Sequence, residues 1–142
     1  MVKLAANLSM MFNEVDMLER FEAAAKAGFK GVEYLFPYDY PADQINEKLS
    51  QNGLKQVLFD LPAGDWNAGD RGLAALPDRV GEFQDGVGVA VEYAKALDCG
   101  LLTCLAGIPT EGTDPEKATQ TLVDNMAFAA PLVADAGAKL LL

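Results

Sequence analysis

The residues Lys139-Leu140-Leu141-Leu142, at the end of the chain, form a short apolar run that follows Gly137. The same order, in which a helical stretch ends at a glycine and an apolar run follows, occurs at three earlier points: Gly28 before residues 32–36, Gly53 before 56–59 and Gly100 before 101–105. Glycine just past a helix is a common helix stop, and apolar runs that alternate with helical patterns are typical of parallel βαβ units. Together with a first strand at Lys3 to Leu8, these patterns predict five strands separated by four helices.

The number of strand–helix units indicates the architecture. Four units and a fifth strand occupy 142 residues, whereas an eight-unit (β/α)8 barrel typically takes about 250 residues. The chain is therefore predicted to be a single α/β domain over residues 1–142, the (β/α)4 half of a barrel plus strand 5, with parallel strands and outer helices. The alternative is a complete five-stranded open sheet of flavodoxin type. That alternative expects a phosphate-binding or acidic site after the first strand, and the Ser-Met-Met-Phe sequence at residues 9–12 offers neither.

Two of the predicted helices carry distinct start and stop features. The first helix is expected to begin at Asn13, whose side chain can cap the helix together with Asp16 three residues later. The last helix opens with Asp114 and Pro115, a capping residue followed by a first-turn proline. Pro131 lies inside this last helix and is expected to kink or split it, because proline lacks the backbone N–H that the helix needs.

Composition argues against several classes of partner. The chain is 51% hydrophobic, which is enough for a packed core, and its 21 acidic against 11 basic residues give a formal net charge of −10. Non-specific binding to nucleic acids or anionic membranes rests on basic surfaces, so neither partner is expected. The apolar runs are also shorter than the roughly 20 residues of a membrane-spanning helix. Cys99 and Cys104 follow no secretory leader, which predicts reduced thiols and a cytoplasmic location.

Candidate functional residues are restricted by type and by place. The chain contains no histidine, which excludes Ser-His-Asp catalysis, Cys-His catalysis and histidine metal ligation within it. Two loops, residues 36–40 and 62–77, are longer than plain connections require, and each follows the carboxyl end of a predicted strand. Parallel α/β folds build their ligand sites at that end of the sheet, so function is expected there.

Three groups of uncommon stretches occur in order along the whole chain. They are Ala5-Ala6-Asn7-Leu8-Ser9-Met10-Met11-Phe12 with Leu35-Phe36-Pro37-Tyr38-Asp39-Tyr40, then Leu61-Pro62-Ala63-Gly64-Asp65-Trp66-Asn67-Ala68-Gly69-Asp70-Arg71-Gly72, and finally Cys104-Leu105-Ala106-Gly107. In these stretches and in their spacing the chain resembles the hydroxypyruvate isomerase family, including its 2-oxo-tetronate isomerase relatives. The resemblance implies the N-terminal half of a xylose-isomerase-like TIM barrel.

The resemblance also implies a reaction. Enzymes of this family interconvert hydroxypyruvate and tartronate semialdehyde, or an analogous pair of a larger keto acid, by moving a proton between neighbouring carbons. In the family the paired glutamates and most metal ligands lie from strand 5 onward, so the catalytic residues are expected beyond Leu142. No cofactor is expected in this chain, and a divalent metal, magnesium or manganese, is implied for the full-length family. Asp60 stands where relatives often carry asparagine, which adds a charge near the mouth of strand 3.

Six residues are candidates for binding a small keto-acid substrate: Asn7, Glu33, Tyr38, Asp65, Trp66 and Arg71. Asn7 can contact a substrate hydroxyl or act as a structural cap at the end of the first strand. Glu33 can be an acid, a base or a metal ligand inside the barrel, or it can pair with a lysine. Tyr38 can reach the substrate or seal the barrel mouth.

The last three candidates share the glycine-bracketed loop 64–72. Arg71 can hold the substrate carboxylate as a two-pronged donor. Alternatively, Asp65 and Arg71 form a pair that makes the loop rigid. Trp66 can cover the site as a lid, or it can anchor the loop by packing against the protein.

Three functional hypotheses remain open from the sequence. In the leading one the chain is a hydroxypyruvate-isomerase-like enzyme fragment, inactive alone, with a 2-oxo-tetronate isomerase relative as the alternative. In the second, two copies associate through the open edges of strands 1 and 5, because exposed strand edges favour pairing. In the third, the half-barrel is a non-catalytic assembly or binding module.

Overall fold

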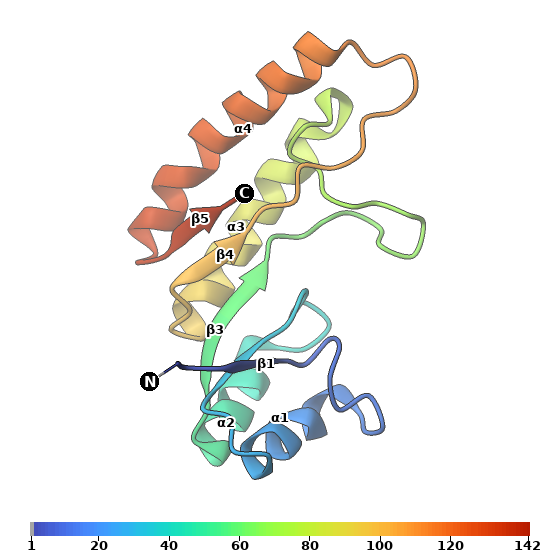
Figure 1. Cartoon of the computed structure of the whole chain (residues 1–142). Helices are drawn as coiled ribbons and strands as arrows, with labels where there is room; N and C mark the ends of the chain where they lie inside the picture. Colours follow the sequence, from blue (N-terminus) through green and yellow to red (C-terminus); the bar gives the residue numbers. More distant parts are fainter. Residues whose placement is uncertain (1) are drawn as a thin grey trace.

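In the computed structural model, which describes residues 2–142, five parallel strands form one sheet with the strands in sequence order (Figure 1). The strands are β1 (Ala5–Asn7), β2 (Gly31–Glu33), β3 (Lys55–Asp60), β4 (Leu101–Thr103) and β5 (Lys139–Leu141). Each strand pairs with the next in parallel. An open sheet of flavodoxin type would have the order 2-1-3-4-5. The observed order therefore confirms the half-barrel prediction and rejects the open sheet.

One helix or helical segment follows each of the first four strands. They are α1 (Met17–Lys26), α2 (Ala42–Asn52), the 3-10 turn η1 (Pro77–Arg79) leading into α3 (Val80–Ala96), and α4 (Pro115–Asp135). The predicted alternation of strands and helices is confirmed. The first strand is shorter than the expected span from Lys3 to Leu8. No helix of residues 2–142 combines the length and the apolar character needed to cross a membrane.

The helix ends test the predicted capping residues. Asp114 caps α4 as expected, since its side chain accepts a hydrogen bond of 3.0 Å from the backbone N–H of Glu116. The predicted start at Asn13 is wrong, because α1 begins after Asp16, whose backbone N–H donates to the Glu19 carboxylate. Asn13 instead donates to the carbonyl of Met10 and so closes the preceding turn.

Of the two outcomes expected at Pro131, a kink or a split, the split does not occur. The helix α4 runs without interruption from Pro115 to Asp135. Pro131 lies on the exposed side, and its neighbours Ala129 and Val133 are fully buried. Packing on both sides of the proline therefore holds the helix where one backbone hydrogen bond is missing.

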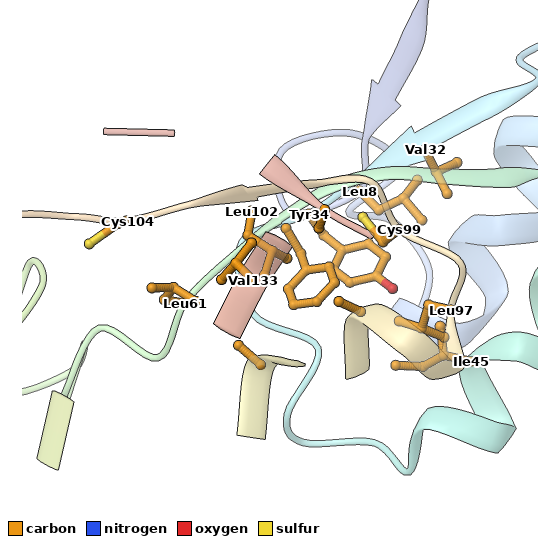
Figure 2. Close-up of a cluster of buried hydrophobic side chains, with 14 of the residues drawn as sticks. Leu8, Val32, Tyr34, Ile45, Leu61, Leu97, Cys99, Leu102, Cys104 and Val133 are labelled. Atoms are coloured by element: carbon orange, nitrogen blue, oxygen red, sulfur yellow. The ribbon is translucent and has the colours of Figure 1, made fainter. Parts of the chain in front are cut away.

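The helices and one face of the sheet enclose a single hydrophobic core (Figure 2). Alternate strand residues such as Ala6, Val32 and Leu102 are completely buried and pack with Phe21 of α1 and Val133 of α4. Burial of this apolar surface is the main force that holds the helices on this outer face of the sheet. The opposite, inner face carries no helix layer, and its residues are the ones available for a site.

A β-bulge decides which residues of β3 reach that inner face. The register between β2 and β3 pairs Val32 with Gln56 but Glu33 with Leu58, so one extra residue lies in β3. A one-residue shift reverses which side chains point to each face of a strand. Beyond the bulge Phe59 is buried in the helix-facing core. Asp60 pairs in register with Thr103 and, as the next residue after Phe59, points to the inner face.

The long loop after β3 is held down on the segment after β4. Gly72 forms an isolated bridge with Ala106, and the N–H of Ala75 donates to the carbonyl of Ala106 at 2.7 Å. Asn125 of α4 is buried and donates to the carbonyl of Ala74 at 2.9 Å. Gly72 has φ of +113°, and a Cβ atom built on it would collide with the carbonyl oxygen of Leu105. Only glycine fits this close approach.

This contact predicts a large difference between two loop glycines. Gly72→Ala should lower the free energy of unfolding by about 2 kcal/mol more than Gly69→Ala, because overpacking costs about 1–3 kcal/mol. Gly69 is the matched control, since it also has a positive φ, +103°, but nothing lies within 4 Å of a Cβ built there. Urea unfolding followed by circular dichroism measures both variants. Equal losses of stability would contradict the close approach.

Candidate functional site

Each of four neighbouring strands ends in a residue with a polar side chain, and these four residues are called the polar row below. Asn7, Glu33, Asp60 and Thr103 are the last residues of β1, β2, β3 and β4. The register pairs Asn7 with Glu33 and Asp60 with Thr103, so the members of each pair lie side by side on one face. This polar row lies at the carboxyl ends of the strands, where ligand sites of parallel α/β folds are built. Only Asn7 and Glu33 of the row were predicted as binding residues from the sequence.

Asn7 and Glu33 contact each other directly. The Nδ2 of Asn7 donates to the Oε1 of Glu33 at 3.2 Å, and the Oδ1 of Asn7 accepts a hydrogen bond of 3.0 Å from the backbone N–H of Ser9. The amide thus both caps the turn after β1 and orients the carboxylate. Glu33 takes part in no ion pair among residues 2–142, so the lysine partner considered from the sequence is not present.

Asp60 is the most perturbed acid of the row. Its side chain is buried, with 8% of the residue exposed. Burial raises the pKa of Asp60, a hydrogen bond from Thr103 lowers it in part and the nearby charge of Glu33 raises it, which together give a pKa of about 6. The sequence signal for this residue was its charge at the end of a strand. The bulge hid its orientation, because simple alternation along β3 would place Asp60 among the helices.

Tyr38 packs between the end of β3 and helix α3, on the helix-facing side of the sheet. Its hydroxyl donates to the backbone carbonyl of Asp60 at 2.7 Å, and its ring packs edge-on against Phe59 and Tyr93 at 6.3 and 5.2 Å between centroids. Burial raises the pKa of the Tyr38 hydroxyl above its ordinary range. The contacts of Tyr38 also fix the backbone that carries Asp60.

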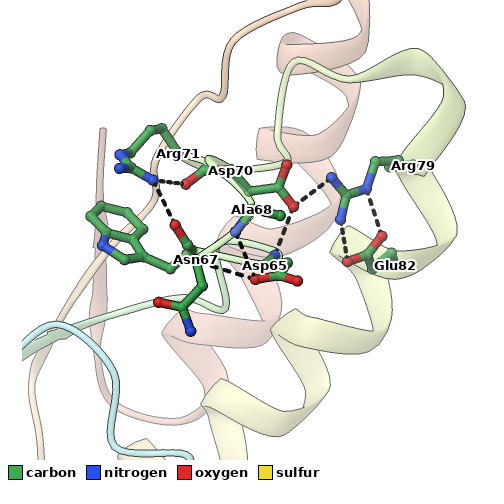
Figure 3. A network of polar contacts seen from close by, with 8 residues as sticks. Asp65, Asn67, Ala68, Asp70, Arg71, Arg79 and Glu82 are labelled. Carbon is green, nitrogen blue, oxygen red and sulfur yellow. Dashed lines mark hydrogen bonds and ion pairs between the residues drawn. The ribbon is translucent and has the colours of Figure 1, made fainter.

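The loop 64–72 is made rigid by a different pair from the one expected (Figure 3). Asp65 does not pair with Arg71. Its Oδ1 accepts hydrogen bonds of 3.0 Å from the backbone N–H groups of Asn67 and Ala68. The stabilising ion pair is Asp70 with Arg79, at 2.7 Å. The predicted Asp65–Arg71 pair is therefore wrong, because the short Asp65 side chain is already used by its own turn.

Arg79 ties the loop to helix α3. Its Nη2 is 2.7 Å from Glu82, and its Nη1 is 2.7 Å from the Asp70 carboxylate. The same carboxylate accepts a hydrogen bond of 2.7 Å from the backbone N–H of Asp65. Bidentate and shared contacts of this kind hold more firmly than a single exposed ion pair.

Arg71 and Trp66 form an exposed stack at the tip of the loop. The guanidinium of Arg71 lies 4.0 Å from the centroid of the Trp66 ring, and its Nη1 donates to the carbonyls of Trp66 and Asp70. The other side of the stack is Phe36, whose ring is 5.1 Å from that of Trp66. The loop after β2 and the loop after β3 therefore meet here. Among residues 2–142, Nε and Nη2 of Arg71 have no hydrogen-bond partner, so their N–H groups are free to donate hydrogen bonds to an anion.

Two surface hollows of the described chain lie away from these residues. One lies at the amino ends of the strands, beside Lys55 and Cys99, and another is lined by Pro77 and Lys117. The polar row itself lies on the inner face of the sheet. Both cysteines are free and buried, as predicted for reduced thiols. Within residues 2–142 no group of three or more His, Cys, Asp or Glu side chains is arranged to hold a metal ion.

The raised pKa of Asp60 predicts a pH-dependent effect on stability. The ordinary pKa of aspartate is about 3.9 and that of Asp60 in the fold is about 6, so between these values the folded chain binds more protons than the unfolded one. The stabilising contribution of Asp60 is then complete below pH 4 and is lost as the pH rises through 6. The free energy of unfolding falls by up to about 3 kcal/mol over this range. Asp60→Asn should remove this dependence.

Urea unfolding at pH 4, 5.5 and 7.5 measures the effect. Relative to the unaltered chain, Asp60→Asn should become progressively more stable as the pH rises. Asp39→Asn is the matched control, because Asp39 is an exposed carboxylate in the nearby loop after β2. A stability difference for Asp60→Asn that stays constant over this range would show that Asp60 titrates normally.

Comparisons with known proteins point to one family. The sequence model of the family described as xylose isomerase-like TIM barrel matches residues 21–142. Hydroxypyruvate isomerase of Escherichia coli (strain K12) is 47% identical over 133 residues, 94% of this chain and 52% of that protein. The 2-oxo-tetronate isomerase of Pectobacterium atrosepticum is 47% identical over 142 residues, 100% of this chain and 54% of that protein. The chain spans about half the length of the curated relatives that it matches.

Solved structures agree. A Brucella melitensis structure described as an AP endonuclease of family 2 superposes with a TM-score of 0.94 at 52% identity, over 99% of this chain and 54% of that one. A D-allulose 3-epimerase from Methylomonas sp. has a TM-score of 0.71 at 18% identity, over 98% of this chain and 50% of that one, and supports the fold alone. The resemblance found in the sequence motifs is confirmed, and the chain belongs to the xylose isomerase-like TIM barrel family.

Proposed function

We propose that this chain is the N-terminal half-barrel of an isomerase that interconverts hydroxypyruvate and tartronate semialdehyde, and that it is inactive alone. The observation that carries the proposal is the polar row at the strand ends, together with an exposed Arg71 that is held on the Trp66 ring in the loop after β3. Relatives that are 47% identical are named for isomerisation of hydroxypyruvate and 2-oxo-tetronate. The single-domain boundaries, residues 1–142, and a cytoplasmic location remain part of this proposal. The two free cysteines suit a reducing compartment.

The proposed reaction divides the work between binding and proton transfer. Moving a proton between neighbouring carbons needs a base on one side, an acid on the other, and donors or a cation at the developing oxyanion. The residues described here supply binding groups: Asn7 and Glu33 can contact substrate hydroxyls. The paired glutamates of the family are expected beyond Leu142. Ligands for magnesium or manganese would come from outside the described residues as well.

Arg71 is proposed to hold the substrate carboxylate. Two of its nitrogens remain without protein partners, and the third is fixed by the carbonyls of Trp66 and Asp70. A guanidinium that is already oriented loses little freedom on binding a planar carboxylate in a two-pronged manner. Asp65 and Trp66 support it by shaping the loop, and Tyr38 supports the end of β3.

The alternative substrate is a larger keto acid such as 2-oxo-tetronate. The polar row lies on the inner face of the sheet, so one more hydroxylated carbon can extend along it. DNA cleavage, suggested by the printed name of the Brucella relative, suits this chain less well. Binding the phosphate backbone rests on clustered lysine and arginine, and this chain has a net charge of −10.

Measurement of hydroxypyruvate isomerisation tests the proposal. The purified 142-residue chain should not isomerise hydroxypyruvate, with or without magnesium or manganese. A protein in which this chain is extended by the second half of the barrel should gain isomerase activity. Turnover by the short chain would mean that the acids described here suffice for catalysis, and no turnover by the extended protein would overturn the proposed function.

Arg71→Ala in the extended protein should raise the Michaelis constant for hydroxypyruvate by more than tenfold, because the carboxylate loses its charged partner. The Michaelis constant of Arg71→Lys should lie between those of the unaltered protein and Arg71→Ala, since lysine keeps the charge but not the two-pronged geometry. Lys26→Ala is the control, because Lys26 pairs only with Glu22 on the exposed side of α1. An unchanged Michaelis constant in Arg71→Ala would remove Arg71 from the site.

Self-association is a second proposal, favoured by the open edges of the sheet. Strands β1 and β5 each pair on one side only. Leu4 and Leu142, which flank these edges, are 70% and 73% exposed. Exposed edges favour pairing with another chain. Two copies would bring ten strands, two more than the family's barrel, so the assembly would be wider or incompletely closed.

Light scattering tests this second proposal. The chain should elute as a discrete dimer, and Leu141→Lys at the β5 edge should shift it towards monomer. Val89→Lys is the matched control, since Val89 on α3 is exposed to a similar extent, 42% against 38% for Leu141. A monomer at all concentrations would exclude assembly as the function of the isolated chain.

A further inference from the structure

Asp60 occupies an unusual electrostatic position. It ends β3 on the inner face and is more than nine-tenths buried. Four described residues from three neighbouring segments lie around it: Glu33 of β2 and Thr103 of β4 on the inner face, and Tyr38 of the loop after β2 with Cys104 after β4 on the helix-facing side. Burial and the charge of Asp60 also raise the pKa of the Cys104 thiol to about 12, so this thiol adds no charge near neutral pH.

Among residues 2–142 no cationic side chain forms an ion pair with the acids of the row, Asp60 and Glu33. The Tyr38 hydroxyl is already used on the backbone carbonyl of Asp60, and Arg71 is fixed on Trp66 at the tip of its loop. A negatively charged ligand at this face would therefore meet two carboxyl groups. Glu33 is oriented by the Asn7 amide, and Asp60 is almost completely buried.

We propose that Asp60 makes ligand binding at this face proton-linked, so that a small hydroxy acid binds when Asp60 is protonated and is repelled when Asp60 is ionised. Protonated Asp60 donates a hydrogen bond to a hydroxyl or carbonyl oxygen of the ligand, whose carboxylate lies towards Arg71. No bond is made or broken, and one proton is taken up or retained with the ligand. The ligand class rests on the proposed function, whereas the charge state of Asp60 does not.

The expected size follows from simple linkage. With a pKa of about 6, Asp60 is mostly protonated at pH 5, and each pH unit above 6 lowers the protonated fraction about tenfold. The dissociation constant should therefore rise roughly thirtyfold between pH 5 and pH 7.5. The carboxyl of a simple hydroxy acid, with a pKa below about 4, stays ionised throughout and adds no dependence.

Isothermal titration calorimetry of the 142-residue chain with glycerate, a hydroxy acid with one carboxylate, tests the proposal at pH 5.0, 6.0 and 7.5. Two buffers of different ionisation enthalpy report the proton taken up. The unaltered chain should show the thirtyfold weakening, and Asp60→Asn should change less than threefold. Asp39→Asn, the exposed control, should behave as the unaltered chain does.

Thr103→Val provides a second readout. Loss of the hydrogen bond that favours ionised Asp60 should move the midpoint of the pH dependence upward. The same pH dependence in Asp60→Asn and in the unaltered chain, or no saturable binding of glycerate at pH 5.0, would overturn the proposal. Isomerase turnover separates the two ideas: proton-linked binding without turnover in the extended protein would defeat the proposed function alone, and turnover without Asp60-dependent linkage would defeat this inference alone.

Discussion

The extra residue that β3 carries opposite Val32 and Glu33 of β2 is the constraint on which the rest of this face depends. It shifts the register by one position, so Phe59 joins the helix-facing core and Asp60 is left on the inner face. Full burial of a phenylalanine side chain stabilises the fold by about 1.5–3 kcal/mol. The cost of burying the Asp60 carboxyl is of similar size. The bulge therefore persists because packing on one face offsets an unfavourable acid on the other.

Rigid loops above the strand ends are the second requirement, and backbone contacts supply most of it. Gly72 lets the loop after β3 touch the segment after β4, and Asn125 holds its far end from α4. The Asp70–Arg79 pair then fixes the turn that presents Arg71. Arg71 is thus exposed but oriented, a combination that favours recognition of an anion because little side-chain freedom remains to be lost on binding.

Local patterns in the sequence predicted the features that depend on local chemistry. The glycines before the apolar runs marked the strand starts, and Asp114 with Pro115 marked the start of α4. The helix start at Asn13 was predicted wrongly, and of the alternatives considered a split at Pro131 and an Asp65–Arg71 pair are not found. Each outcome depends on residues elsewhere in the fold: a competing cap at Asp16, packing around Ala129 and Val133, and Arg79 in η1. The inward orientation of Asp60 depends on a pairing between strands, which no single strand's pattern contains.

The arrangement of charge on this face favours a ligand with two unlike ends. The loop after β3 carries the Arg71 guanidinium, and the strand ends carry Glu33 and Asp60, which take part in no ion pair among residues 2–142. Two like unit charges at about 4 Å repel by about 4 kcal/mol at an effective dielectric constant of 20, so a ligand that places an anion over Glu33 is strongly disfavoured. A polyanion such as a DNA backbone places phosphates at regular intervals and cannot keep all of them beside Arg71. A small hydroxy-keto acid has one carboxylate for Arg71 and a neutral hydroxylated end for the strand ends. Under the proposed function, the electrostatics of the half-barrel would therefore select the orientation of such a ligand before any catalytic group takes part.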